Sequence, residues 1–257
     1  PFPRRPLSGK RLPMSIWGKV LGGAAGFAIG GPLGALIGAG AGHLYDKARG
    51  NVSGIAGNDP TKQVGFTIAV IALGAKLAKA DGVVTPDEIQ AFRRVFKVAP
   101  EETQNVAKIF NQARKSTAGF EAYARQVGGM FQDNPAVLEE LLNCLFHIAR
   151  ADGSVHEDEL AYLRSVAEIF GFTEADFARI REQNMGPDQA DPYTVLGVAR
   201  AADEAIIKAT YRKLARENHP DMLIAQGMPE EFIEVANDKL AAINAAYDKI
   251  CAQRGIK

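Results

Sequence analysis

The run of residues 20–42 carries no charged side chain, and a glycine stands at every fourth position along it. Its length is enough to cross the hydrocarbon core of a bilayer, for which about 20 residues suffice. On a helix, this spacing places the glycines on one face, where two helix backbones can approach closely in lipid. The glycines concerned are Gly22, Gly26, Gly30, Gly34, Gly38 and Gly42. The pattern predicts a glycine-zipper transmembrane helix over residues 16–44 that contacts lipid, forms a homodimer and is kinked at Pro32.

The residues on either side of this run are typical of a membrane interface. Trp17 and Lys19 precede it, and Tyr45, Lys47 and Arg49 follow it, as aromatic and basic residues do at the two faces of a bilayer. A flexible glycine-rich linker is an alternative, but such linkers do not space glycine regularly between large apolar residues. A cleaved signal peptide is a second alternative.

The orientation of this segment depends on residues 1–13, which have no helical period and precede Met14. If they are an upstream extension, the basic residues after the run outnumber those before it, and the C-terminal bulk is cytoplasmic. If they belong to the working protein, their arginines and lysines favour the opposite orientation. Residues 45–61 are expected to be a linker to the remainder of the chain.

The composition of the chain is that of ordinary globular material, with 47% hydrophobic residues and a formal net charge of zero. This balance of charge argues against nucleic acid as a partner. The two cysteines, Cys144 and Cys251, fall in segments expected to be helices of different domains. We therefore expect free thiols and no disulfide framework.

A short motif occurs twice, as ADGVVTPDE at residues 80–88 and as ADGSVHEDE at residues 151–159. Each copy follows an apolar helical segment and opens another. The repeat therefore predicts a duplicated helix-turn-helix unit within an all-α domain over residues 62–185. Gly82 and Gly153 suit the left-handed residue that ends a helix.

The two copies resemble the TerB-like domain, named from tellurite-resistance proteins. The resemblance implies a divalent metal site formed by acidic residues of the repeat. By position these are Asp81, Asp87, Glu88, Asp152, Asp158 and Glu159. Helix capping is the favoured alternative, because the segment from Thr85 to Glu88 is a capping box with proline at the first helical position. An EF-hand is excluded, because its glycine is the sixth loop residue and here it directly follows the first aspartate.

Two amphipathic segments near the C-terminus predict an antiparallel helical hairpin. In residues 205–217, Ile207, Tyr211 and Leu214 form an apolar stripe at helical spacing. Residues 239–250 repeat the pattern, so the two stripes can pack together. An adjacent face of the first segment is basic, and its residues are Lys208, Arg212, Lys213 and Arg216.

The tripeptide His219-Pro220-Asp221 lies between the two segments. Pro220 disfavours helical geometry at the residue before it, so His219 is predicted to end the first helix and Asp221 to start a rigid, exposed loop. No nucleophile and base accompany these residues. We therefore expect no enzymatic activity and no required cofactor.

Residues 189–257 resemble a J-domain, the cochaperone module that stimulates ATP hydrolysis by DnaK-type chaperones. The resemblance rests on residues 191–198 as a short first helix, residues 211–215 in the second, the tripeptide, and residues 239–247 in the third. It implies that the basic face docks on an acidic patch of the chaperone and that Asp221 meets a basic residue there. Without the tripeptide, the basic face would be interpreted as a solvated helix surface.

The order of the segments resembles the DjlA family, the membrane-anchored DnaJ-like proteins of Gram-negative bacteria. Residues 222–230 look like an insert of that family, although Met222 stands where lysine is common. The link at residues 186–190 is short, which permits rigid coupling of the two domains. The resemblance also favours the cytoplasmic orientation and disfavours a cleaved signal peptide, because a J-domain needs its chaperone.

Together these patterns predict an all-α protein with a transmembrane helix, a TerB-like domain and a J-domain hairpin. The expected function is that of a single-pass cochaperone of the bacterial inner membrane, which recruits a DnaK-type chaperone and triggers its ATP hydrolysis. An alternative is a metal-responsive membrane stress protein that acts through the acidic repeat, with the J-domain as an adaptor.

Overall fold

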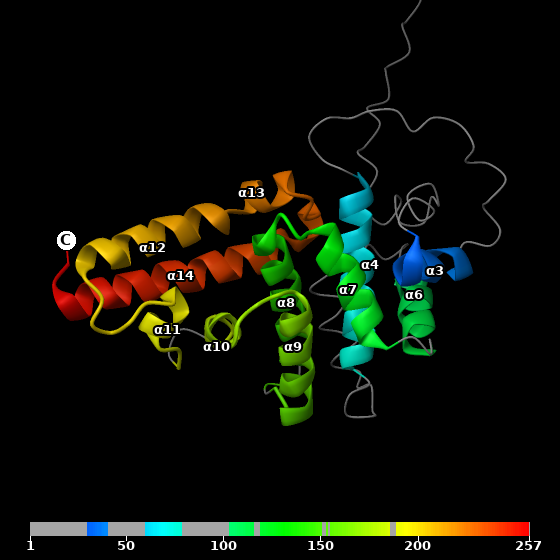
Figure 1. Cartoon of the computed structure of the whole chain (residues 1–257), viewed down its shortest axis with the longest axis horizontal. Coiled ribbons are helices and arrows are strands. Elements are labelled where there is room, and N and C mark those ends of the chain that lie inside the picture. The colour runs from blue at the N-terminus through cyan, green and yellow to red at the C-terminus, as the bar shows by residue number, and fades with distance from the viewer. Residues whose placement is uncertain are drawn as a thin grey trace, which may run out of the picture.

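The computed structural model describes residues 30–40, 60–78, 103–115, 119–150, 153, 155–185 and 189–256. All regular secondary structure in these ranges is helical, which agrees with the predicted fold class. The helices are α3 (Gly31–Gly40), α4 (Pro60–Leu77), α6 (Thr103–Lys115), α7 (Phe120–Met130), α8 (Pro135–Ala149), α9 (Glu157–Ile169), α10 (Glu174–Gln183), α11 (Pro192–Leu196), α12 (Glu204–Glu217), α13 (Pro220–Ala225), the 3-10 helix η3 (Glu230–Phe232) and α14 (Ile233–Arg254). Figure 1 shows a bundle that contains α4, α7, α8 and α9, and a hairpin of α12 and α14 that projects from it.

The central helix of the bundle is α4. Its residues from Val64 to Ala75 are all buried, and it packs against α6, α7 and α8. A helix that is apolar on all sides is stable only when neighbours surround it. Tyr162 of α9 adds a polar contact, because its hydroxyl donates to the carbonyl oxygen of Leu73 at 2.9 Å. Burial raises the pKa of this phenol well above its ordinary value.

The second copy of the repeated motif connects α8 to α9. Gly153 has a φ of 105°, in the left-handed region that glycine tolerates. His156 is the N-cap of α9, and its backbone N–H donates to Oε2 of Glu159 at 2.9 Å. The capping interpretation is therefore confirmed for Glu159. The first copy, residues 80–88, lies outside the described residues.

Of the uncharged run, the structure describes residues 30–40. Gly30 and Gly31 have φ angles of 58° and 59°, so the helix α3 begins only at Gly31. Pro32 lies in the first turn of α3, where its missing N–H costs no helical hydrogen bond. The prediction of one continuous helix kinked at Pro32 is therefore wrong, because a helix cannot continue through the left-handed geometry of Gly30 and Gly31.

The helix α3 packs against α6 and α7. Leu33 is fully buried, and its backbone N–H donates a hydrogen bond to Oε1 of Gln126 at 2.9 Å. Nε2 of Gln126 donates to the carbonyl oxygen of Gly30 at 2.8 Å. Within the described ranges, no helix is both long enough and apolar enough to cross a membrane. The predicted dimer-forming glycines outside these ranges are Gly22, Gly26 and Gly42.

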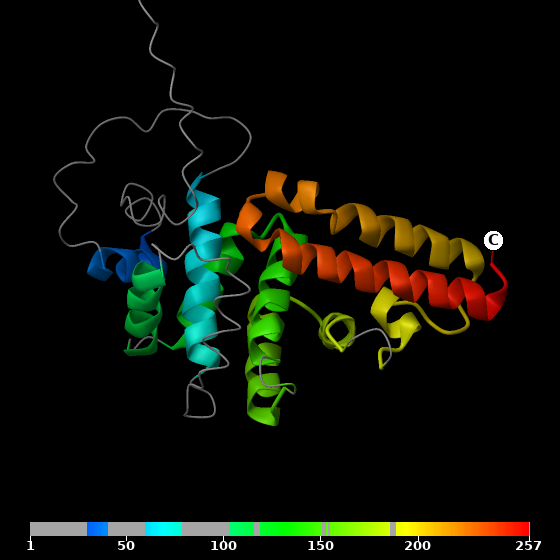
Figure 2. The same cartoon turned by 180° about the vertical axis from the view of Figure 1, so that it is seen from behind.

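The predicted helical hairpin is formed by α12 and α14, which lie side by side in both views (Figures 1 and 2). The rings of Tyr211 and Tyr247 stack between them, with centroids 3.9 Å apart and an interplanar angle of 5°. The hydroxyl of Tyr211 also hydrogen-bonds to Oδ1 of Asn244 at 3.1 Å. The short helix α11 completes a small core whose buried members are Tyr193, Val195, Leu196, Ile207, Ile243, Ala246 and Ile250.

The helix α14 is longer than the predicted third helix and belongs to two hydrophobic cores. Val235 and Ala236, near its beginning, are part of the core of the bundle. Ile243 and Ile250 are part of the core of the hairpin. Figure 2 shows the beginning of α14 reaching the bundle at α8, with which it is in contact. The J-domain-like hairpin and the bundle are therefore packed together.

Candidate functional site

The His-Pro-Asp tripeptide lies at the junction of α12 and α13. His219 is the N-cap of α13, and its Nδ1 accepts a hydrogen bond from the backbone N–H of Asp221 at 3.2 Å. Pro220 is the first residue of α13, a position that suits its fixed φ and missing N–H. The prediction that Asp221 starts a loop is therefore wrong. The proline does end α12, but it also starts a new helix, and Asp221 lies in the first turn of that helix.

The two charged or titratable members of the tripeptide are open to solvent, whereas the proline is buried. The side chain of His219 is 51% exposed and that of Asp221 is 86% exposed, with Nδ1 and Oδ2 separated by 3.8 Å. A carboxylate in the first turn of a helix is favoured by the helix dipole. The tripeptide thus presents an imidazole and a carboxylate in a fixed arrangement on the surface.

The predicted basic face lies on α12, which leads directly into the tripeptide. Arg212, Lys213 and Arg216 are exposed. Lys208 is half-buried and forms an ion pair with Glu204 one turn earlier, and this hydrogen bond raises the pKa of Lys208. The structure therefore places the basic side chains on one helix, with His219 just beyond its end.

The insert after the tripeptide packs into the bundle, a contact that the sequence did not predict. Leu223 of α13, Met228 and Phe232 of η3 are fully buried in the core of the bundle. The ring of Phe232 meets that of Phe66 edge to face at a centroid distance of 5.0 Å. Phe66 in turn contacts Phe131 at 6.2 Å.

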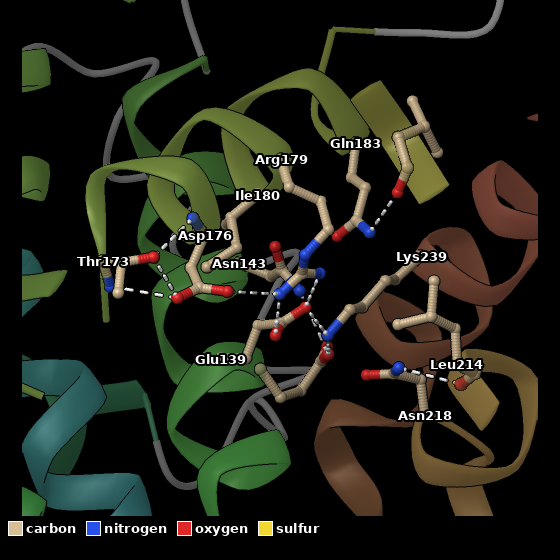
Figure 3. Close-up of polar contacts among 12 residues, drawn as sticks. Glu139, Asn143, Thr173, Asp176, Arg179, Ile180, Gln183, Leu214, Asn218 and Lys239 are labelled. Atoms are coloured by element: carbon tan, nitrogen blue, oxygen red, sulfur yellow. Dashed lines mark hydrogen bonds and ion pairs between the residues drawn. The ribbon is translucent and has the colours of Figure 1, made fainter. Parts of the chain in front are cut away.

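A buried ionic network is the second connection between bundle and hairpin (Figure 3). Glu139 of α8 accepts two hydrogen bonds from Arg179 of α10, at 2.8 Å and 2.7 Å. Nζ of Lys239 in α14 lies 2.7 Å from Oε1 of Glu139 and 3.7 Å from Oε2 of Glu140. Asn143 donates to Oε2 of Glu140 at 3.2 Å. Two cations and two carboxyl groups thus meet where the three helices converge.

The pKa values of the two adjacent glutamates in this network are shifted in opposite directions. Burial alone would raise the pKa of Glu139, but Lys239 and Arg179 together lower it to about 2. Burial raises the pKa of Glu140, because its contact with Lys239 is longer and only partly offsets the loss of hydration. Glu139 is therefore the firmly ionised partner of the two cations.

Sequence reasoning missed this network, although one signal was present. Glu139 and Glu140 stand within the mostly apolar and buried segment of α8, where a charged residue is costly unless it is paired. Their partners, Arg179 and Lys239, are distant in sequence and have no distinguishing pattern. The pair of glutamates indicated a buried ionic contact, but the sequence alone could not identify its other members.

The acidic residues of the repeated motif do not converge in the described part of the chain. Asp158 is exposed, and the carboxylate of Glu159 caps α9. Within that part, no group of histidine, cysteine, aspartate and glutamate residues could hold a metal ion. The remaining candidates lie outside the described residues, and they are Asp81, Asp87, Glu88 and Asp152.

Comparison with known families matches three consecutive parts of the chain. Residues 14–52 match the co-chaperone DjlA transmembrane domain, residues 67–182 the tellurite resistance protein TerB, and residues 191–254 the DnaJ domain. No solved structure matches the chain. The first match indicates membrane anchoring. The last, together with the surface-exposed tripeptide on a helical hairpin, defines a J-domain cochaperone.

Whole-chain relatives narrow this class further. The co-chaperone protein DjlA of Photobacterium profundum is 33% identical over 94% of this chain, and that of Vibrio cholerae is 34% identical over 95%, each along the full length of the relative. The Escherichia coli K12 protein of the same name is 28% identical over 95% of the chain. The chain belongs to the co-chaperone DjlA family.

Proposed function

We propose that this protein recruits a DnaK-type chaperone to the inner face of the bacterial cytoplasmic membrane and stimulates its ATP hydrolysis through His219, Pro220 and Asp221. The observation that carries the proposal is the exposure of His219 and Asp221 at the end of the hairpin, held in place by the N-cap of α13. The protein contributes no chemical step of its own in this proposal. It changes the rate of its partner.

The basic face of α12 supports the same function through electrostatics. Arg212, Lys213 and Arg216 are exposed on the helix that leads into the tripeptide. A positively charged helix surface accelerates encounter with an acidic partner and orients docking, more than it adds affinity. We therefore assign the approach of the chaperone to α12 and the activating contact to the tripeptide.

Single-turnover ATP hydrolysis by the cognate DnaK-type chaperone tests the proposal. The chaperone is loaded with ATP and mixed with the full chain in lipid nanodiscs, with empty nanodiscs as the control. We expect the full chain to accelerate hydrolysis. An unchanged rate at saturating concentrations would refute the cochaperone function.

Dimerisation through the glycines of the membrane segment is a separate proposal. The left-handed geometry of Gly30 makes that position unsuitable for a test, because any larger residue there would be strained. Gly34 lies within α3 and has ordinary helical geometry. We expect Gly34→Leu to reduce the crosslinked dimer in native membranes while the protein stays in the membrane fraction. Equal crosslinking would mean that this glycine does not pair helices.

A further inference from the structure

The segment that follows the tripeptide is fixed in the core of the bundle. Leu223, Met228 and Phe232 are all 0% exposed, and they belong to the same core as Phe66 and Phe131. Full burial of a large apolar side chain is favourable relative to leaving it exposed to water. This segment is therefore a docked element of the bundle and not a free loop of the hairpin.

Gly227 allows this close approach. Its φ is 110°, and a Cβ atom at this position would lie 3.0 Å from Cβ of Lys62 and 3.2 Å from Cε1 of Phe131. The first contact is close to the backbone of α4, so it cannot be relieved by moving the end of a flexible side chain. The turn between α13 and η3 thus rests directly on the bundle, at a position where a side chain would push the two apart.

Backbone hydrogen bonds connect this docked turn to the tripeptide. The carbonyl oxygen of His219 accepts from the N–H of Met222 at 2.9 Å and of Leu223 at 3.1 Å. The carbonyl oxygen of Leu223 accepts from the N–H of Met228 at 2.9 Å. Movement of Leu223 or Met228 away from the bundle would therefore change the orientation of α13, whose N-cap is His219.

The hairpin is attached to the bundle at two further places. Lys239 pairs with Glu139 as described above. At the α10–α11 junction, Nε2 of Gln183 donates to the carbonyl oxygen of Val195 at 3.0 Å, and Glu182 accepts from the N–H of Asp191 at 2.5 Å. Three separated attachments prevent rotation of the hairpin about any one of them.

We propose that the TerB-like bundle positions the tripeptide for chaperone activation, with Phe66, Phe131 and Gly227 as positioning residues that act through α13. The inference rests on the function proposed above and adds a role for the second domain. The docking leaves His219 and Asp221 exposed, so it orients the tripeptide without covering it. The bundle and hairpin together are then the activating unit.

The test compares Gly227→Ala with Gly153→Ala in the full chain. Gly153 is a matched control, because its φ of 105° imposes the same backbone strain but an added Cβ would meet nothing within 4 Å. Hydrogen exchange of the α13 amides reports the docking, and single-turnover hydrolysis over a range of cochaperone concentrations separates the maximal stimulation from the half-saturating concentration.

We expect Gly227→Ala to accelerate exchange in α13 and to lower the maximal stimulation about fivefold or more, as is usual for coupling between sites. The half-saturating concentration should change little, because the basic face of α12 is untouched. Gly153→Ala should keep the wild-type maximum. Equal maxima for the two variants, or wild-type exchange in α13 of Gly227→Ala, would overturn the inference.

If Gly227→Ala does not fold, Phe232→Leu takes its place. Leucine keeps an apolar side chain but removes the edge-to-face contact with Phe66. The same two readouts apply, and wild-type maximal stimulation by this variant would also contradict the inference. Failure of the proposed function is distinguishable, because in that case the wild-type chain itself would not stimulate hydrolysis.

Discussion

Nζ of Lys239 lies 2.7 Å from Oε1 of Glu139, and the two side chains are only 2% and 9% exposed. This pair joins α14 of the J-domain to α8 of the TerB-like bundle. Removal of one partner from a buried pair leaves the other charge without compensation in a low-dielectric site. The contact therefore makes the packing of the two domains sensitive to single charge changes.

Replacement of Lys239 by methionine should destabilise the protein by about 3 kcal/mol, because buried Glu139 then loses one of its two cationic partners and buried Glu140 loses its contact with Lys239. The measurement is urea unfolding of the chain in detergent at neutral pH, monitored by circular dichroism. Lys249→Met is the matched control, since Lys249 is exposed on the same helix and its loss should change stability by less than about 0.5 kcal/mol. Equal stabilities for the two variants would contradict a role for the pair.

The contribution of Glu139 should disappear on acidification. Its pKa falls from an ordinary 4.5 to about 2 on folding, so ionised Glu139 stabilises the folded state above pH 4.5 and loses this effect as the pH falls toward 2. The stability difference between wild type and Glu139→Gln should therefore shrink by about 3 kcal/mol over this window. Thermal unfolding at a series of pH values measures it.

The stability of wild type must be compared with that of Glu139→Gln, because the contribution of Glu140 to stability changes with pH in the opposite direction. Its raised pKa favours the folded state as the pH falls toward 4.5, but Glu140 is present in both proteins and largely cancels. A difference that stays constant from neutral pH to the acid limit would show that Glu139 is not ionised in the folded state.

Both His219→Gln and Asp221→Asn should abolish stimulation of the chaperone while leaving the helix content unchanged. The two side chains are exposed, and the contacts at stake are the N-cap of α13, worth about 1 kcal/mol, and the 3.8 Å approach of Nδ1 of His219 to Oδ2 of Asp221. Single-turnover hydrolysis and circular dichroism measure the two effects. Asp248→Asn, on an exposed position of α14, should stimulate like wild type. Undiminished activity of either tripeptide variant would remove the basis of the proposed function.

Reversal of charge on α12 should weaken binding of the chaperone. We expect Arg212→Glu together with Lys213→Glu to raise the half-saturating concentration, and added salt to raise it for wild type, because exposed charges are screened. Lys108→Glu, on an exposed position of α6, is the control and should have no effect. An affinity that does not depend on salt would mean that the basic face is only solvated.

The hairpin could be predicted because its stripes are regular. Ile207, Tyr211 and Leu214 recur at helical spacing, and all three pack on the hairpin core. The start of α13 could not be separated from a loop, since Pro220 is compatible with both. Glycine is likewise compatible with two conformations. Its spacing around Gly30 suggested a helix, but glycine also adopts the left-handed geometry found there.

The docking of the insert was beyond prediction for a different reason. Leu223, Met228 and Phe232 lie in short elements without a sustained period, and their neighbours in the bundle, Phe66 and Phe131, come from distant parts of the chain. Periodicity identifies which face of a helix is buried, but not which other element covers it. Only the assembled structure shows that the covering element is the TerB-like domain.

Because α14 is shared between two cores, the C-terminal domain is not structurally independent of the bundle. A cut at the domain link would leave Val235 and Ala236 without the surface that covers them, and Leu223, Met228 and Phe232 would be exposed as well. Fusion of this J-domain alone to another membrane anchor would therefore expose an aggregation-prone apolar patch beside the tripeptide. We therefore expect the two domains to need each other when they are expressed or engineered.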